Sequence, residues 1–461
     1  MIDCLFINPP FNRHGVDYQK DASLARFQMD AINPGIIALF SYLRDQGLTS
    51  KILDFYRNLD FNDILVKIEE SIKEFNPLVV AISNSSAYDY IDTIELVNWL
   101  YLKYPNIVVV VGGQHASNLK KVIFNDCQNL RFLLQGEGEY ALYEFIMKIR
   151  NGKKANLNTS NLWERVEGGA ILKPQRIAKP FDLNQGSPID LSVYPEALSF
   201  TPFVEESRAC PYACRFCNNN EFYNSMVRVK GLEKFEKDLS NAVSFFGTKP
   251  MYAILTSDLD YNTAKEKALI MRKYGIIWSS QMDCFHDWTQ LVPIFKESGM
   301  KLLNLGLESG SPRILKMMGK SNNPKKYLEN CRNILMKCHE YNILTRVNIL
   351  IYPGENEESL NETLTYLDSI SPWLQGVVAC ATIAYPGSRL MQDMNIYEKE
   401  YGARLVDTPQ CRVTHHYPIH PSVQISFEKA TDIALYIEER YSPTRILSQK
   451  HNYKKYEGEL F

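Results

Sequence analysis

Short apolar runs alternate with helical segments through the first 150 residues, and this alternation constrains the fold more than any other feature. The runs are almost continuously apolar, as in strands buried on both faces, and the intervening segments carry apolar residues three or four apart. Strand–helix units of this kind predict a parallel sheet covered by helices on both sides. We therefore expect an α/β fold that begins with a five-stranded, doubly wound, Rossmann-like domain over residues 1–150. The predicted strands are Leu5–Asn8, Lys51–Asp54, Leu78–Ile82, Ile107–Val111 and Phe132–Leu134.

The rest of the chain divides into three further parts. Residues 151–199 are rich in Asn, Gly, Pro and Lys and predict a linker packed along both domains, with a hairpin turn at 167–170. A second alternation covers residues 200–390, and its six strands are too few for a closed eight-fold barrel, so it predicts a partial (β/α)6 TIM-type barrel. Residues 391–461 predict a small, mainly helical C-terminal region. The predicted barrel strands are Phe203–Glu206, Tyr252–Thr256, Ile276–Ser279, Leu302–Leu307, Thr345–Ile351 and Val377–Ile383.

Charge and cysteine content narrow the function classes. The chain has 51 Lys and Arg against 53 Asp and Glu, and this near-neutral balance argues against nucleic acid or a membrane as a partner. The sequence has no apolar run of the roughly 18 residues that a bilayer span needs, and its first residues lack the basic stretch of a signal peptide. Seven of the ten cysteines are scattered and three are clustered, which predicts a reduced, cytoplasmic protein with one local thiolate site.

The clustered cysteines are Cys210, Cys214 and Cys217, which directly follow the first predicted barrel strand. Active sites form at this end of such barrels. Three thiolates at this spacing can wrap one corner of a [4Fe-4S] cluster and leave one iron open for another ligand. A four-cysteine zinc site would need a second Cys-x-x-Cys, and a redox pair would not need Cys210. The loop therefore predicts a cluster with three protein ligands.

Small and polar residues follow the strands of the first domain. The carboxyl ends of parallel strands meet at one edge of the sheet, where ligands bind, and glycine lets a ligand approach the backbone closely. The alternative is that these residues only make tight strand-to-helix turns. The candidate ligand-binding residues are Asn8, Pro9, Ser83, Asn84, Ser85, Gly112, Gly113, Gln114, His115, Gly136, Glu137, Gly138 and Glu139.

The motif Cys-x-x-x-Cys-x-x-Cys, with Phe216 before its last cysteine, resembles the radical S-adenosylmethionine (SAM) superfamily. The stretches 8–10, 112–115, 136–139, 306–311 and 352–355 resemble its subfamily with a cobalamin-binding domain. That subfamily includes carbon methylases of natural-product pathways and the anaerobic cyclase of chlorophyll synthesis. The resemblance covers residues 1 to about 390 in the expected order.

The resemblance implies an enzyme that binds SAM at the open iron and cleaves it reductively to a 5′-deoxyadenosyl radical. The implied reaction is cobalamin-dependent C-methylation of a small-molecule or natural-product substrate, with electrons from a flavodoxin- or ferredoxin-type donor. The strand-end residues above would then bind cobalamin, with the two domains facing each other and the substrate between them. The implied SAM-binding residues are Phe216, Asp258, Glu308, Ser309 and Arg346.

The sequence departs from the family pattern in two places. Ser257-Asp258 stands where relatives carry two aspartates, and Ile351-Tyr352 replaces the usual glycine before Pro-Gly-Glu. The motif Asp-x-His-x-x-Gly, which supplies the lower cobalt ligand in classical cobalamin proteins, does not follow the first strand, because His14 is followed at once by Gly15. As is usual in the subfamily, no histidine from that motif is therefore expected below the cobalt.

Other motifs favour plainer interpretations. Gly319-Lys320-Ser321 lacks the upstream glycine of a P-loop and predicts a helix end, and the histidines at 415, 416 and 420 predict a polar loop more than a metal site. Candidate catalytic residues after the third barrel strand are Cys284, His286 and Asp287, although a buried thiol is the ordinary role for Cys284.

Three other functions stay open at this point. Radical rearrangement, dehydration or cyclisation would cleave SAM without methyl transfer. A tRNA methylthiotransferase would carry a second cluster in its first domain, which here holds only Cys4 and Cys127. A non-catalytic binding protein would not need three clustered, oxygen-sensitive thiolates. The sequence gives neither the substrate nor the oligomeric state.

Overall fold

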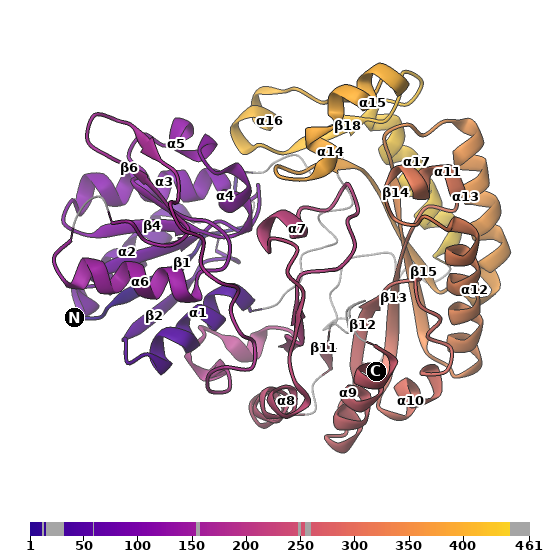
Figure 1. Ribbon diagram of the computed structural model, residues 1–461, viewed down its shortest axis with the longest axis horizontal. Coiled ribbons are helices and arrows are strands. Elements are labelled where there is room, and N and C mark those ends of the chain that lie inside the picture. Colours follow the sequence, from indigo (N-terminus) through magenta and orange to yellow (C-terminus); the bar gives the residue numbers. More distant parts are fainter. Residues whose placement is uncertain are drawn as a thin grey trace.

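The computed structural model describes residues 1–11, 13–14, 32–58, 60–153, 157–247, 250–253 and 260–442. Two α/β bodies stand side by side, with the N-terminal sheet on one side and the barrel strands on the other (Figure 1). The C-terminal segments lie along the top of this view and reach from the barrel toward the first domain. The predicted α/β class and order of the two bodies are confirmed.

The first body contains a sheet in the order β2-β1-β3-β4-β5-β6-β7, whose first five members are parallel. These five are β1 (Cys4–Asn8), β2 (Ser50–Asp54), β3 (Val79–Ser83), β4 (Val108–Gly112) and β5 (Phe132–Leu134). The order reverses between β1 and β3, which is where such sheets bind ligands. The helices are α1 (Pro34–Asp45), α2 (Phe61–Phe75), α3 (Tyr90–Lys103), α4 (Gln114–Leu119), α5 (Val122–Asp126) and α6 (Glu139–Arg150).

The sheet has seven strands where the sequence predicted five. The predicted turn at 167–170 is present, with Gly168 and Gly169 at φ of 83° and 84°. It joins β6 (Leu162–Arg165) to β7 (Ile171–Leu172), and β6 pairs antiparallel with β5. Part of the segment predicted as a linker therefore extends the first sheet. The strand was not predicted because its two inward side chains are Leu162 and Glu164, which give β6 no alternating apolar pattern.

The second body is an open parallel sheet in the order β15-β14-β13-β12-β11-β8, as predicted for a partial barrel. Its strands are β8 (Phe203–Val204), β11 (Met251–Ala253), β12 (Trp278–Met282), β13 (Met300–Glu308), β14 (Leu344–Ile351) and β15 (Gly376–Ala381). Its helices are α8 (Leu232–Phe246), α9 (Tyr261–Lys273), α10 (Val292–Glu297), α11 (Pro312–Met317), α12 (Pro324–Glu340) and α13 (Glu357–Ile370). Short 3-10 turns lie at Leu191–Val193, Ala197–Ser199 and Ser371–Trp373.

The C-terminal region is mainly helical and also holds a small antiparallel sheet. Its helices are α14 (Arg389–Gln392), α15 (Met394–Tyr401), α16 (Pro409–Thr414) and α17 (Phe427–Tyr441), and its strands are β16 (Ile383–Ala384), β17 (Arg404–Leu405) and β18 (Tyr417–His420). Helix α17 covers the barrel's edge strand β15. The Glu438 carboxylate accepts the Ala379 N–H at 2.9 Å, and the Ser442 hydroxyl accepts the Val377 N–H at 3.0 Å. These contacts satisfy backbone groups that an open edge would expose.

Candidate active site

The three clustered cysteines lie on one loop between the two bodies. The loop follows strand β9 (Ser207–Arg208) and precedes helix α7 (Asn219–Phe222). Cys210, Cys214 and Cys217 are half-buried, whereas six of the other seven cysteines are buried. Accessible thiols therefore gather at the edge of the barrel where the sequence placed the cluster.

Contacts from three other segments fix this loop. The Arg215 N–H donates to the Met318 carbonyl at 2.8 Å, and the Arg215 carbonyl accepts the Leu390 N–H at 2.8 Å. The Tyr212 ring stacks on Phe285 with centroids 3.8 Å apart. The segments after β12, at the end of α11 and at the start of α14 thus hold the loop in one conformation.

The spacing of the three thiols suits a cluster better than a single metal ion. In the part of the chain that the structure describes, their sulfur atoms do not all come within 4.8 Å of one another. Three thiolates on one zinc ion, with bonds of about 2.3 Å, would lie closer together than this. A cube of iron and sulfide spreads its thiolate ligands further apart. The residues therefore fit a [4Fe-4S] cluster with three protein ligands.

Lys320 and Glu308 lie beside the cysteine loop. Glu308 ends β13 at a φ of 70°, a strained value for a residue with a side chain, and its Oε1 lies 3.2 Å from the Lys320 Nζ. Burial raises the pKa of Cys214 to about 11, and the nearby Lys320 cation opposes that rise. Burial alone would lower the pKa of Lys320, but the Glu308 carboxylate and the Cys214 thiol raise it. The loop therefore faces a permanent cation, which favours thiolate ligands.

Sequence reasoning missed Lys320. Gly319 does end helix α11, with a φ of 64°, as predicted. The lysine that follows returns to the site, and its Nζ lies 6.0 Å from the centre of the Phe216 ring. No spacing rule in the sequence links residues 308, 320 and 216.

The other residues expected to bind SAM differ in placement. Arg346 is buried on β14, and its Nε donates to the Asn304 Oδ1 on β13 at 2.7 Å. The Ser309 hydroxyl lies 3.2 Å from the Thr363 hydroxyl, so it contributes to the turn after β13. Asp258 lies outside the described residues. Asn304 is a further polar residue of the barrel interior that the sequence did not single out.

The candidate catalytic residues separate into three environments. Cys284 is fully buried beside Cys331, and burial raises its pKa well above the usual thiol value. Asp287 is exposed and caps a local turn. The Nδ1 of half-exposed His286 lies 3.3 Å from the Oδ1 of the buried Asp283. The carboxylate beside the imidazole is therefore Asp283, which the sequence did not indicate, and Cys284 has the environment of a structural thiol.

The carboxyl-end loops of the first sheet contact the segment that follows the cysteine loop. The Gln114 side-chain amide donates to the Asn218 Oδ1 at 3.1 Å and to the Asn219 Oδ1 at 2.9 Å. The Lys120 Nζ lies 2.5 Å from the Glu221 Oε1. Figure 1 shows α7 between the two sheets. The two bodies therefore face each other through these loops, as the topology predicted.

A cavity of about 150 Å³ opens at the switch point of the first sheet. An apolar cavity of about this volume holds a benzene-sized ring. Cobalamin carries a flat, largely apolar dimethylbenzimidazole ring on its nucleotide tail, so the cavity fits that group. Its lining is mainly apolar and includes four charged side chains. The lining residues are Phe6, Pro34, Gly35, Ile36, Leu39, Ala81, Ile82, Ser83, Val110, Val111, Gly112, Gly113, Leu134, Gly136, Glu137, Gly138, Glu139, Leu142, Glu205, Arg208, Phe222 and Tyr223.

Seven of the thirteen predicted cobalamin-binding residues line this cavity, and they end or follow β3, β4 and β5. They are Ser83, Gly112, Gly113, Gly136, Glu137, Gly138 and Glu139. The other six do not line it; they are Asn8, Pro9, Asn84, Ser85, Gln114 and His115. Direct contact of any of these residues with cobalamin stays a prediction.

Two of the residues away from the cavity have clear structural contacts. The Asn8 amide donates to the Asp54 carboxylate at 2.9 Å. His115 is buried, which lowers its pKa to about 3, and its Nε2 lies 3.1 Å from the Thr414 carbonyl. Asn8 thus ties β1 to β2, and His115 ties the first domain to the C-terminal region.

Comparisons with known proteins agree with this arrangement. The description "Radical SAM superfamily" matches residues 204–367, and "B12 binding domain" matches residues 21–146. An uncharacterized methyltransferase of Pyrococcus horikoshii is 24% identical over 382 residues, which cover 78% of this chain and 77% of that protein. An anaerobic magnesium-protoporphyrin IX monomethyl ester cyclase of Rubrivivax gelatinosus is 21% identical over 387 residues, covering 78% of this chain and 64% of the cyclase.

A solved structure shares the fold. It is the radical SAM methyltransferase TsrM from Kitasatospora setae with cobalamin and [4Fe-4S] cluster bound, and it aligns with a TM-score of 0.73 at 13% identity, over 89% of this chain and 81% of that one. The fold and the thiol loop define a radical SAM enzyme with a B12-binding domain. The chain carries a B12-binding domain followed by a radical SAM domain, the pair of domains that its sequence motifs predicted.

Two further observations bear on other functions. Cys4 and Cys127 belong to separate apolar cores, so they do not build the second cluster that a tRNA methylthiotransferase would carry in its first domain. Among the helices that the structure describes, none combines the length and apolarity needed to cross a membrane.

Proposed function

We propose that this protein is a cobalamin-dependent radical SAM methyltransferase that methylates carbon in a small molecule. The observation that carries the proposal is the facing pair of sites. A loop with three half-buried thiols borders the barrel interior, and the loops around a ring-sized apolar cavity contact the segment next to it.

Each part of the site has a distinct task in this proposal. When bound, the cluster supplies the electron that cleaves SAM, and cobalamin supplies the methyl-carrying centre. Cys210, Cys214 and Cys217 hold the cluster, and Lys320 with Glu308 sets the charge beside it.

The overall reaction balances with two SAM molecules and two electrons. One SAM transfers its methyl group and leaves as S-adenosylhomocysteine. The other is cleaved to methionine and 5′-deoxyadenosine, which carries away the hydrogen atom removed from the substrate carbon. The methyl group takes the place of that hydrogen. An external one-electron donor of the flavodoxin or ferredoxin type supplies the electrons.

The proposal is tested without knowing the substrate. The chain is reconstituted anaerobically with iron, sulfide and hydroxocobalamin and then incubated with SAM and titanium(III) citrate. We expect both S-adenosylhomocysteine and 5′-deoxyadenosine by mass spectrometry, and a matched preparation without hydroxocobalamin should form only 5′-deoxyadenosine. If 5′-deoxyadenosine forms alone in both preparations, the protein performs radical chemistry without methyl transfer, as a cyclase would. If neither product forms, the proposal is wrong.

Filling the cavity should displace cobalamin and spare the cluster. Ala81 on β3 lines the cavity, and the substitution Ala81→Phe adds a ring to that space. We expect the corrinoid retained after gel filtration to fall at least tenfold, with the iron content unchanged. The smaller substitution Ala81→Ser should retain at least threefold more corrinoid than Ala81→Phe. Equal retention by the two variants would show that the ring occupies another place.

We also propose a cytoplasmic location, because half-buried cluster thiols need a reducing compartment.

A further inference from the structure

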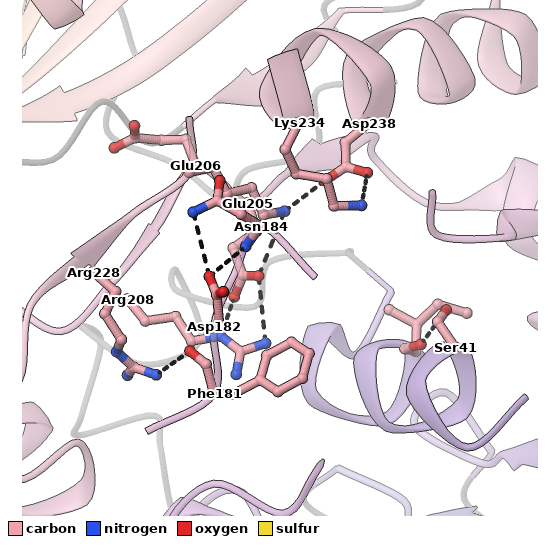
Figure 2. A network of polar contacts seen from close by, with 12 residues as sticks. Ser41, Phe181, Asp182, Asn184, Glu205, Glu206, Arg208, Arg228, Lys234 and Asp238 are labelled. Carbon is pink, nitrogen blue, oxygen red and sulfur yellow. Dashed lines mark hydrogen bonds and ion pairs between the residues drawn. The ribbon is translucent and has the colours of Figure 1, made fainter. Parts of the chain in front are cut away.

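A buried group of charged residues joins the cysteine loop to the cobalamin-binding loops. Figure 2 shows its barrel side, with Glu205, Arg208 and Arg228. Its centre is Arg208, which lies on β9 two residues before Cys210 and is 8% exposed. Its Nη1 lies 2.7 Å from the Glu137 Oε1 and 2.6 Å from the Glu139 Oε1, and its Nε lies 2.8 Å from the Glu205 Oε1. Glu137 lies in the loop between β5 and α6, and Glu139 is the first residue of α6, so one guanidinium connects both bodies.

A second arginine holds the same loop. Arg228 lies on β10 (Arg228–Val229), which pairs antiparallel with β9 so that Arg228 stands opposite Arg208. The Arg228 Nη1 lies 2.7 Å from the Glu137 Oε2 and donates to the Phe181 carbonyl at 2.9 Å. Glu137 therefore forms ion pairs with two guanidinium groups from neighbouring strands.

The remaining charges support Arg208 from the barrel side. Glu205 lies 3.7 Å from the Lys230 Nζ, which in turn lies 2.8 Å from Asp238 on α8. Carboxylates on three sides thus direct the guanidinium.

These contacts lie on the wall of the ring-sized cavity, where Arg208, Glu137, Glu139 and Glu205 all form part of the lining. Buried ion pairs contribute little net stability compared with apolar packing, but the planar guanidinium fixes the orientation of its partners. Arg208 borders the cobalamin-binding cavity and also stands at the start of the cysteine loop. Its ion pairs therefore set the separation between the cavity and that loop. A general stabilising role would not require this position.

We propose that Arg208 is a positioning residue that sets the cluster loop at the distance from cobalamin that methyl transfer requires. This inference rests on the proposed function. SAM cleavage needs only the cluster and SAM, whereas formation of S-adenosylhomocysteine also needs the cobalt close to the SAM methyl group. Arg208 therefore controls the formation of S-adenosylhomocysteine more strongly than the formation of 5′-deoxyadenosine.

The test is the substitution Arg208→Lys, which keeps the charge and removes the fork of donors. With hydroxocobalamin, SAM and titanium(III) citrate, we expect S-adenosylhomocysteine formation to fall at least tenfold and 5′-deoxyadenosine formation to change less than threefold. Because both products come from the same folded molecules, loss of folded protein leaves their ratio unchanged. Hydrogen exchange, measured without SAM, should become faster in residues 135–139 and 209–217.

Two further variants make the result decisive. Glu139→Gln keeps the shape of the loop side chain and should lower the product ratio in the same direction, so it replaces Arg208→Lys if that variant does not fold. Arg176→Lys alters an exposed ion pair with Glu144 and should keep the wild-type ratio. If both products fall together in Arg208→Lys and Glu139→Gln, Arg208 is structural only and the inference is overturned. Failure of the proposed function is distinct, since the wild-type protein would then form no S-adenosylhomocysteine.

Discussion

The substitution Cys214→Ala is expected to leave the reconstituted protein without its iron–sulfur cluster and unable to cleave SAM. Cys214 is the middle ligand of the loop and lies beside Lys320. The loss of one of three thiolates leaves two irons of the cube without protein ligands once SAM is absent, so the cluster is not retained. We expect iron per chain to fall to the level of the untreated protein and 5′-deoxyadenosine formation to fall at least a hundredfold.

A cysteine elsewhere in the chain provides the control. Cys411 is buried on α16 in the C-terminal region, and Cys411→Ala should reconstitute with wild-type iron and form 5′-deoxyadenosine at the wild-type rate. Hydroxocobalamin binding should persist in Cys214→Ala, because the cavity of the first domain lacks any contact with this side chain. A Cys214→Ala protein with wild-type iron content would show that the cluster has another set of ligands.

The sequence predicted the parallel parts of the fold because their signal is local. The run Val108–Val111 is apolar and the strand Met300–Glu308 is largely so, and glycine or polar residues mark their ends. Strand β6 escaped prediction because its register places Glu164 inward, where the carboxylate accepts the Leu157 N–H at 3.0 Å. A pattern of apolar residues cannot reveal a four-residue strand in which one of the two buried side chains is charged.

The site was predictable to the same extent. The three cysteines lie within eight residues, so their spacing alone points to a cluster. Residue spacing does not indicate Lys320, Asn304 or Asp283. Lys320 and Asn304 are brought to the site by partners on other elements, Glu308 and Arg346. Asp283 is brought beside His286 by the course of the loop that holds both. Glu137 and Glu139 were placed at the correct loop, but their pairing with Arg208 depends on how two domains pack. Sequence order carries no information on that packing.

The substitution Gly113→Ala is expected to remove cobalamin from the protein. Gly113 has a φ of 102°, and a Cβ there would lie 2.3 Å from the Asn84 carbonyl oxygen. The clash is with backbone, so the loop after β4 must move away from the loop after β3. Both loops lie at the border of the cavity. Backbone strain and overpacking of this kind cost roughly 2–5 kcal/mol. We expect corrinoid retained after gel filtration to fall at least tenfold and the thermal unfolding midpoint of the apoprotein to fall.

The neighbouring Gly112 provides the control, because an alanine there also adds a methyl group but causes no clash. A Cβ at Gly112 would meet its nearest neighbour, the Leu134 carbonyl oxygen, at 3.6 Å, an ordinary contact distance. Gly112→Ala should therefore lower corrinoid retention less than threefold. Both variants should keep the wild-type iron content, because neither residue contacts the cysteine loop through the hydrogen bonds that hold it. If Gly113→Ala retained cobalamin as well as Gly112→Ala, the close approach of the two loops would not be what shapes the cobalamin site.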